Sequence, residues 1–178
     1  MSAVFLISDT HFGHIGVCKF LRGDGTKLRP WATPEEMDEA LIQNWNATVG
    51  PKDLVYHLGD VVINRRCLPT VGRLNGRKRL IRGNHDTFRL NEYTPYFEDV
   101  LGSHQLDGMI LTHIPIHPAQ LRRFGTNVHG HMHANRVEKD CGIVTVVDPR
   151  YFCVSVEHTD YRPLSLEEVR ARIEDEQA

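Results

Sequence analysis

The feature that most constrains this chain is a short apolar segment followed by a polar cluster, repeated five times. The clusters read SDTH (residues 8–11), LGD (58–60), GNHD (83–86), TH (112–113) and HGHMH (129–133). A short apolar run bounded by polar residues is typical of a buried strand. In α/β folds, ligands bind in the loops that follow the strands. The pattern therefore predicts one site assembled from five strand ends.

The stretch NVHGHMHAN (residues 127–135) holds three histidines within five residues. On an extended strand His131 and His133 would point the same way, because side chains alternate between the two faces. On an irregular loop they could point anywhere. The local spacing therefore does not decide between a metal site and a polar loop that is rich in histidine.

Helices are expected between several of the strands. Thr33 and Pro34 match the N-cap and the first position of a helix, and this helix should end near residues 49–51, which include Gly50 and Pro51. Its inward face is predicted at three apolar residues spaced four apart, Met37, Leu41 and Trp45.

Two further helices are expected, at residues 66–74 and from Ser165 to about residue 176, where Ser165 and Glu168 form a capping box. The segments GIVTVV (142–147) and YFCVSVE (151–157) suggest two late strands that form an antiparallel pair. Strands that alternate with helices predict an α/β fold with mixed sheets and outer helices. The length of 178 residues suits one domain, expected over residues 1–178.

Composition gives no support to several classes of protein, and it does not exclude local patches of charge. A net charge of -2 gives no basis for binding extended nucleic acid or a membrane surface. The longest apolar runs are too short to span a bilayer, and the first residues do not resemble a secretory signal. Four widely spaced cysteines without a CxxC pair favour free thiols in a reducing compartment, so a cytoplasmic location is expected.

If the five strand ends converge, one pocket receives two carboxylates, one amide and five imidazoles, and no cysteine. Nitrogen and oxygen donors suit Zn, Mn, Fe or Ni. A single catalytic zinc takes only three protein ligands. A set of this size therefore suits two metal ions that share a bridging carboxylate. The residues are Asp9, His11, Asp60, Asn84, His85, His113, His131 and His133.

The order D-x-H, G-D, G-N-H-[DE], H, G-H-x-H resembles the calcineurin-like metallophosphoesterase superfamily. The resemblance covers residues 1–133 directly. The segments SDTHFGH, EEMDEALIQNWN and VYHLGD are most similar to the small single-domain phosphoesterases of bacteria and phages in that superfamily. The resemblance implies a four-layer α/β/β/α sandwich of two mixed sheets flanked by helices.

The resemblance also implies roles for individual residues. The first metal would be bound by Asp9, His11 and His133, and Asp60 would bridge both metals. The second metal would be bound by Asn84, His113 and His131. His85 would not bind metal but would face the substrate, and His129 would support a ligand or pack. Gly130 is expected to let the backbone turn tightly before the last two histidines.

The implied activity is hydrolysis of a small phosphoester, in which a hydroxide that bridges the metals attacks phosphorus and His85 protonates the leaving group. The two divalent ions would most readily be Mn, with Fe, Zn or Ni as alternatives. Two aspartates leave such a site about two units positive, which attracts a phosphate anion. Phosphodiesters of the nucleotide or cyclic nucleotide type are favoured. The alternatives are a phosphomonoesterase, a protein phosphatase, a nuclease and a non-catalytic scaffold of the same fold.

Several features limit or leave open these expectations. Protein phosphatases carry G-D-x-V-D-R-G, whereas this chain has Ile63 and Asn64 at the second aspartate and the arginine, which argues against that class. Substrate selection is expected from residues 12–32 and 115–125, in a monomer or small homo-oligomer. The sequence does not decide whether His14 and His117 contact the substrate or only stabilise their loops. It likewise does not decide whether His57 is simply buried or supports a metal ligand. For four arginines the sequence does not decide whether they bind the phosphate or lie on a solvent-exposed face of the protein: Arg65, Arg66, Arg122 and Arg123.

Overall fold

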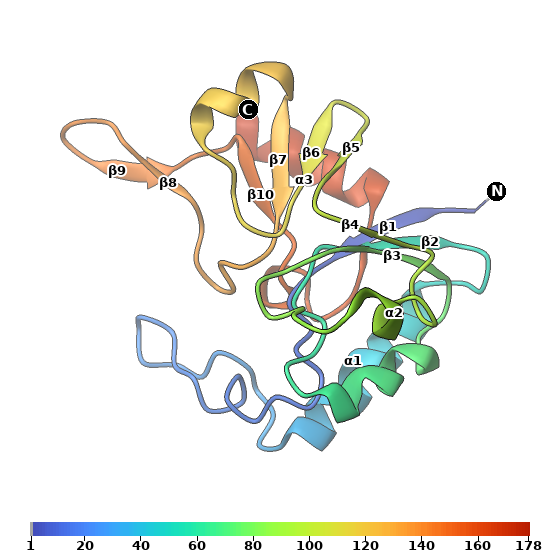
Figure 1. The fold of residues 1–178 in the computed structure, drawn as a ribbon. Coiled ribbons are helices and arrows are strands. Elements are labelled where there is room, and N and C mark those ends of the chain that lie inside the picture. Colours follow the sequence, from blue (N-terminus) through green and yellow to red (C-terminus); the bar gives the residue numbers. More distant parts are fainter. Residues whose placement is uncertain (1) are drawn as a thin grey trace.

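The protein, described by a computed structural model over residues 2–178, is built on two β-sheets that pack against each other (Figure 1). The first sheet has the strand order β11-β1-β2-β3-β4. Strands β1 to β4 run parallel and β11 is antiparallel to β1. Their bounds are Val4–Ile7 (β1), Leu54–His57 (β2), Arg77–Ile81 (β3), Asp99–Leu101 (β4) and Leu164–Ser165 (β11).

The second sheet has the order β10-β7-β6-β5 and is also mixed. Strands β10, β7 and β6 run parallel, and β5 pairs antiparallel with β6. The prediction of an α/β fold with two mixed sheets is therefore confirmed. The strand bounds are His104–Leu106 (β5), Met109–Leu111 (β6), Thr126–His129 (β7) and Tyr151–Cys153 (β10).

Helices flank the sheets on both sides (Figure 1). The outer face of the first sheet is covered by α1 (Pro34–Thr48), the 3-10 helix η1 (Arg65–Arg73) and the short α2 (Leu90–Tyr93). The outer face of the second sheet is covered by one short 3-10 helix, η2 (Pro118–Arg123). Helix α3 (Leu166–Gln177) packs along β1 and β11, and η3 (Val156–His158) follows β10.

Strand β1 shows how one apolar run serves two cores. Phe5 and Ile7 lie in the core shared with α1, whereas Leu6 lies in the core between the two sheets. This follows from the alternation of side chains along a strand. A sheet buried on both faces needs continuous apolar runs, which is the pattern that the sequence shows.

The predicted helix ends are confirmed at both long helices. The Thr33 side chain accepts a hydrogen bond from the Glu36 backbone N–H at 3.2 Å, and α1 ends before Val49. The capping box of Ser165 and Glu168 forms in both directions at the start of α3. The helix expected at residues 66–74 is a 3-10 helix instead, and it contains Pro69, which has no N–H to donate to a helical ladder.

The antiparallel pairing expected for the two late apolar segments is wrong. Strand β9 (Thr145–Val147) pairs with β8 (Glu138–Asp140) in a separate hairpin, whereas β10 runs parallel to β7. The turn of this hairpin includes Gly142, at φ 88°, which favours a glycine. The hairpin tip is not part of a core, because Ile143 is 96% exposed.

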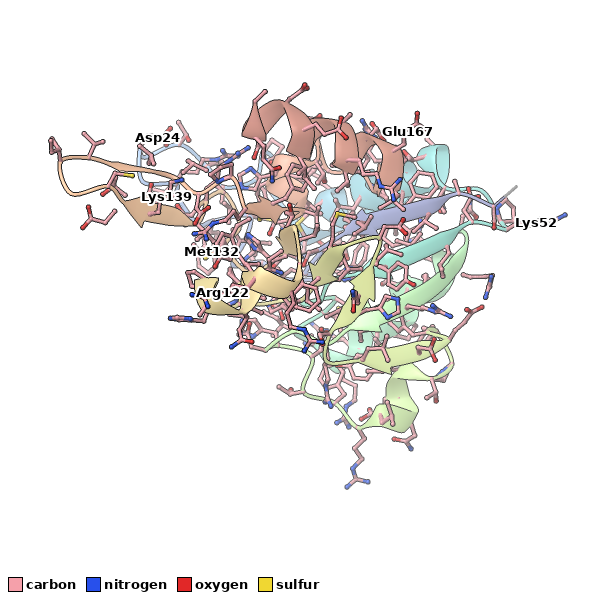
Figure 2. All side chains as sticks on the ribbon, turned by 90° about the horizontal axis from the view of Figure 1, so that it is seen from above. Asp24, Lys52, Arg122, Met132, Lys139 and Glu167 are labelled. Carbon is pink, nitrogen blue, oxygen red and sulfur yellow. The ribbon has the colours of Figure 1, made fainter. Side chains whose placement is uncertain are left out.

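The β8–β9 hairpin and the loop that contains Asp24 project from the same side of the molecule, as the two views show (Figures 1 and 2). In the described part of the chain, no helix is long and apolar enough to cross a membrane.

The contrast between core and hairpin gives a stability prediction. Leu80→Ala removes a fully buried side chain of β3 and should lower the free energy of unfolding by about 2–5 kcal/mol. Ile143→Ala, a matched change at the exposed hairpin tip, should alter it by less than about 0.5 kcal/mol. Urea unfolding of both variants measures this difference. Similar losses in the two variants would contradict the assignment of the core.

Candidate metal centre

The ends of five strands meet at one edge of the two sheets and bring the predicted residues together. Asp60 follows β2, His113 follows β6, and two groups of carboxylate and imidazole atoms form where the strand ends meet. In each group the candidate ligand atoms lie within 4.8 Å of one another. The first group is Asp9, His11 and His133, and the second is Asp60, His113 and His131.

Asp60 lies between the two groups. Its Oδ2 atom is 3.6 Å from Nε2 of His11 in the first group and 3.4 Å from Nε2 of His113 in the second. All three side chains are almost fully buried. Asp60 is therefore in a position to contact ligands of both groups.

Asn84 and His85, which follow β3, border the second group from its open side. The Asn84 Oδ1 atom lies 3.0 Å from Nε2 of His113 and 3.0 Å from Nδ1 of His131. The His85 backbone N–H donates to Oδ1 of Asp60 at 2.9 Å, and its exposed ring lies edge-on to His11 with ring centroids 5.7 Å apart. The structure thus brings all eight predicted residues together, with His85 at the rim.

The deepest part of the centre contains buried polar atoms that lack hydrogen-bond partners within residues 2–178. They are Oδ1 of Asp9 and both ring nitrogens of His11. An unsatisfied buried donor or acceptor costs about 1–3 kcal/mol. Carboxylate oxygen and imidazole nitrogen are the donors that Mn, Fe, Zn and Ni accept, so these atoms fit a metal ion.

The backbone of the centre is held in an unusual conformation. Five of the candidate ligands have φ between 48° and 67°, in the left-handed region that residues with side chains rarely adopt. Each such residue costs on the order of 1–3 kcal/mol, and such residues cluster at functional sites. The five are Asp9, His11, Asp60, His131 and His133.

Two glycines let neighbouring strand ends approach closely. A Cβ atom at Gly130 would lie 2.0 Å from Oγ of Ser8 and 2.4 Å from Oδ2 of Asp9. A Cβ atom at Gly83 would lie 2.3 Å from Oδ1 of Asp60. The φ of Gly130 is not positive, and the left-handed residues are His131 and His133 themselves. The absence of a side chain at Gly130 leaves the space in which the Asp9 carboxylate lies.

Comparison with known proteins decides the family. The model of the calcineurin-like phosphoesterase superfamily domain matches residues 3–153. This chain belongs to the calcineurin-like phosphoesterase superfamily. The family resemblance predicted from the five motifs is thereby confirmed, and the match continues past His133 to include β10.

One relative and one solved structure match nearly the whole chain, and a phage relative matches about half of it. An uncharacterised protein of Methanocaldococcus jannaschii is 35% identical over 184 residues, 98% of this chain and 93% of that protein. The gene 66 protein of Mycobacterium phage D29 is 41% identical over 91 residues, 48% of this chain and 41% of the phage protein. The crystal structure of a protein of unknown function from Aquifex aeolicus has a TM-score of 0.67 at 26% identity and covers 97% of this chain and 100% of that chain.

In this member of the phosphoesterase superfamily, burial and neighbouring charges shift the pKa values of the candidate ligands. Burial lowers the pKa of His11 well below its usual range, which leaves the neutral ring that a metal requires. Burial alone would raise the pKa of Asp60, but the hydrogen bond and charge of His113 lower it to about 2. For His133, burial would lower the pKa of the ring, but the hydrogen bond that the ring donates to the Glu157 carboxylate opposes this, and the net result is a raised pKa.

The sequence did not reveal the role of Asp86, the last residue of GNHD. Its buried carboxylate accepts three backbone N–H groups, from Asp60 at 2.8 Å, Gly83 at 2.9 Å and Val61 at 3.1 Å. It therefore joins the loop after β2 to the loop after β3 and fixes the backbone that carries Asp60. Its place in the motif was the signal that could have identified it.

Three further supporting residues carried no such signal. The Ser155 hydroxyl donates to Oδ2 of Asp9 at 2.8 Å. The buried carboxylate of Glu157 lies 3.1 Å from Nδ1 of His133 and accepts a hydrogen bond from Arg29 at 2.9 Å. Arg29 is itself fully buried and also donates to the backbone carbonyls of Asp9 and Thr10.

Of the four histidines whose roles were open, His57 and His129 are buried, His14 is partly buried and His117 is exposed. The ring of His57, the last residue of β2, contacts the loops that follow β1 and β2: its Nε2 atom lies 3.0 Å from Oγ1 of Thr10, and its Nδ1 atom accepts the Gly59 backbone N–H. Burial lowers the pKa of His57 to about 3. His129 is also buried, and its Nδ1 atom lies 2.7 Å from the Gly130 carbonyl. His14 lies near the centre, with its ring centroid 5.7 Å from that of His11. His117 is exposed and caps η2.

The four arginines for which phosphate binding was one of two alternatives lie outside both ligand groups. Arg65 forms an ion pair with Glu92 at 2.9 Å and stacks over the Phe88 ring. The Arg66 backbone N–H donates to Oδ1 of Asn64, the N-cap of η1. Arg122 (Figure 2) and Arg123 are exposed on η2. The structure gives none of the four a contact with the candidate ligands.

The close approach at Gly130 predicts a specific defect. Gly130→Ala should displace the Asp9 carboxylate, because the new Cβ atom would overlap it, and should lower both the melting temperature and the amount of divalent metal bound per chain. Gly102→Ala is the matched control, since no atom lies within 4 Å of its added Cβ. Thermal unfolding and metal analysis test both variants. Normal metal content in Gly130→Ala would contradict the proposed crowding.

Proposed function

We propose that this protein is a dinuclear metal-dependent phosphoester hydrolase. The observation that carries the proposal is the pair of ligand groups joined by Asp60, with unpartnered buried atoms of Asp9 and His11 in the first group. Membership of the calcineurin-like phosphoesterase superfamily supports the reaction class. A metal ion gives these buried donors a partner, which hydrogen bonds within the described chain do not.

We assign the donors to two ions. The first ion would be held by Asp9, His11 and His133, and Asp60 would serve both. The second ion would be held by His113, His131 and Asn84, whose Oδ1 atom faces both imidazoles. Manganese is the proposed ion, and Fe, Zn or Ni would suit the same nitrogen and oxygen donors.

When bound, two divalent cations would supply the positive charge that holds a phosphate and makes a water molecule acidic enough to act as a nucleophile. The protein meets these charges with only two carboxylates, Asp9 and Asp60, so the centre retains attraction for an anion. Arg29 lies behind the first group and is neutralised by Glu157, which keeps its charge out of the substrate site.

His85 is the proposed proton donor to the leaving oxygen. Its ring is exposed at the rim, outside both ligand groups, whereas its backbone is fixed by the hydrogen bond to Asp60. A positioned imidazole is the commonest general acid in hydrolysis near neutral pH and contributes about 10²–10⁴-fold. The position of His85 beside His11 matches this task.

The proposed substrates are small phosphodiesters of the nucleotide type. The second sheet is covered by one short helix, η2, and the rim of the centre, including Asn84 and His85, is exposed. An open rim accepts a phosphate with two organic substituents. A net charge of -2 offers no extended basic track for a long polyanion.

Metal and activity measurements test the proposal directly. The purified protein should bind close to two Mn²⁺ per chain and hydrolyse bis-p-nitrophenyl phosphate with added Mn²⁺, and a chelator should abolish turnover. The same assay with p-nitrophenyl phosphate and an oligonucleotide separates diesterase, monoesterase and nuclease activity. Less than half a metal per chain together with no Mn²⁺-dependent turnover would identify a non-catalytic member of the superfamily.

His85→Ala separates catalysis from metal binding. Because His85 lies outside both ligand groups, the variant should retain its metals while kcat falls about 10²-fold or more. His117→Ala is the control, since that exposed histidine caps η2 and should leave kcat unchanged. Steady-state kinetics and metal analysis are measured on the same preparations. Loss of metal from His85→Ala would show that His85 is a ligand and not a proton donor.

A further inference from the structure

A cleft of about 340 Å³ opens beside the metal centre. One wall is formed by the loop after β1, with Phe20–Gly23 and Leu28, and the other by His131–Asn135. Because this second wall includes His131 and His133, the cleft reaches both ligand groups. A phosphate held between the groups would have one of its organic substituents at the mouth of this cleft.

The first wall of the cleft is apolar and aromatic. Phe20 is 52% exposed and Leu21 is 64% exposed, and both line the cleft with the more buried Leu28. The Phe20 ring lies edge-on to His14 at 6.0 Å, and His14 lies 5.7 Å from His11. A line of aromatic rings therefore runs from the metal centre into the cleft.

The polar groups of the cleft suit an anionic ligand. Arg22, whose guanidinium donates to the Leu28 carbonyl at 3.4 Å, and Asn135 are among the polar residues that line the cleft, and no acidic residue lines it in the described chain. Ligand pockets typically combine an apolar surface with a few polar groups and have volumes of about 300–1,000 Å³. The volume of this cleft, about 340 Å³, suits one nucleoside-sized group.

The position of His85 indicates which substituent enters the cleft. His85, the proposed donor to the leaving oxygen, is not among the residues that line this cleft. The leaving group must contact the proton donor, so the cleft is left for the substituent that stays on phosphorus. Met132 belongs to the second wall of the cleft, and Figure 2 shows it on the same side of the molecule as the loop that contains Asp24.

We propose that this cleft binds the retained substituent of the phosphodiester, and that this substituent is a flat aromatic group of about nucleoside size stacked on Phe20. The inference rests on the proposed phosphodiester hydrolysis and names the residue that selects the substrate. Stacking on an exposed aromatic ring tolerates different bases, because every base has a π-face.

Two chromogenic diesters with the same leaving group test the inference. Bis-p-nitrophenyl phosphate retains an aromatic substituent and methyl p-nitrophenyl phosphate retains a methyl group. With Mn²⁺ present, Phe20→Ala should lower the ratio of kcat/KM for the aromatic over the methyl diester about tenfold, chiefly through KM, which corresponds to about 1.4 kcal/mol. Because the ratio is compared between variants, the different chemical reactivity of the two esters cancels.

Two further variants control the experiment. Phe20→Trp keeps a flat ring and should restore the ratio, which a general structural defect would not do. Leu90→Ala removes an equally exposed apolar side chain from α2, away from the cleft, and should leave the ratio unchanged. Thymidine 5′-p-nitrophenyl phosphate should have a lower KM than the methyl diester in the wild type and in Phe20→Trp.

The outcomes separate this inference from the proposed function. Hydrolysis of neither diester by the wild-type protein would overturn the proposed function and the inference together. Hydrolysis of both, with a ratio that Phe20→Ala leaves unchanged, would overturn the inference alone. A change in kcat alone, equal for the two diesters, would likewise overturn it, because that result would mean that Phe20 affects the metal centre and not the retained substituent.

Discussion

The buried ion pair of Arg29 and Glu157 is the interaction on which the geometry of the metal centre depends. It joins two side chains 128 residues apart, and neither is exposed to solvent. Arg29 donates to the carbonyls of Asp9 and Thr10, whereas Glu157 contacts His133. One buried pair therefore fixes the loop after β1 against the loop after β7. Removing one partner of such a pair leaves an uncompensated buried charge, which commonly costs about 3–5 kcal/mol.

The left-handed backbone of the centre needs such support. Five candidate ligands have positive φ, a conformation that a free loop would leave. Three carboxylates hold the strand-end loops in place by accepting backbone N–H groups: Asp86 binds those of Asp60, Val61 and Gly83, Asp9 that of His131, and Asp60 that of His85. The candidate ligands thus also fix one another's backbone. The strain and the ligand geometry are consequently set by the same contacts.

The parts of the structure that the sequence predicted are those encoded locally. A capping box such as Ser165 and Glu168 needs only four residues, and each polar cluster follows its strand directly. The supporting residues could not be found in this way, because Arg29 lies in a turn-rich loop and its partner Glu157 is in η3. The wrong pairing of β9 has the same origin. The sequence of an apolar segment does not show whether the segment is buried in a sheet or, like the one that contains Ile143, projects into solvent from a hairpin.

The unpartnered atoms at the centre connect the proposed metals to the stability of the fold. Buried polar atoms of Asp9 and His11 have no hydrogen-bond partners within the part of the chain that the structure describes, and the backbone at both residues is strained. In the absence of metal, the folded state bears both costs. A metal ion that binds the folded state but not the unfolded chain lowers the free energy of the folded state by RT ln(1 + [M]/Kd). A metal ion bound at this centre would then stabilise the sandwich, because the donors that would hold the ion are also the strained ends of its strands.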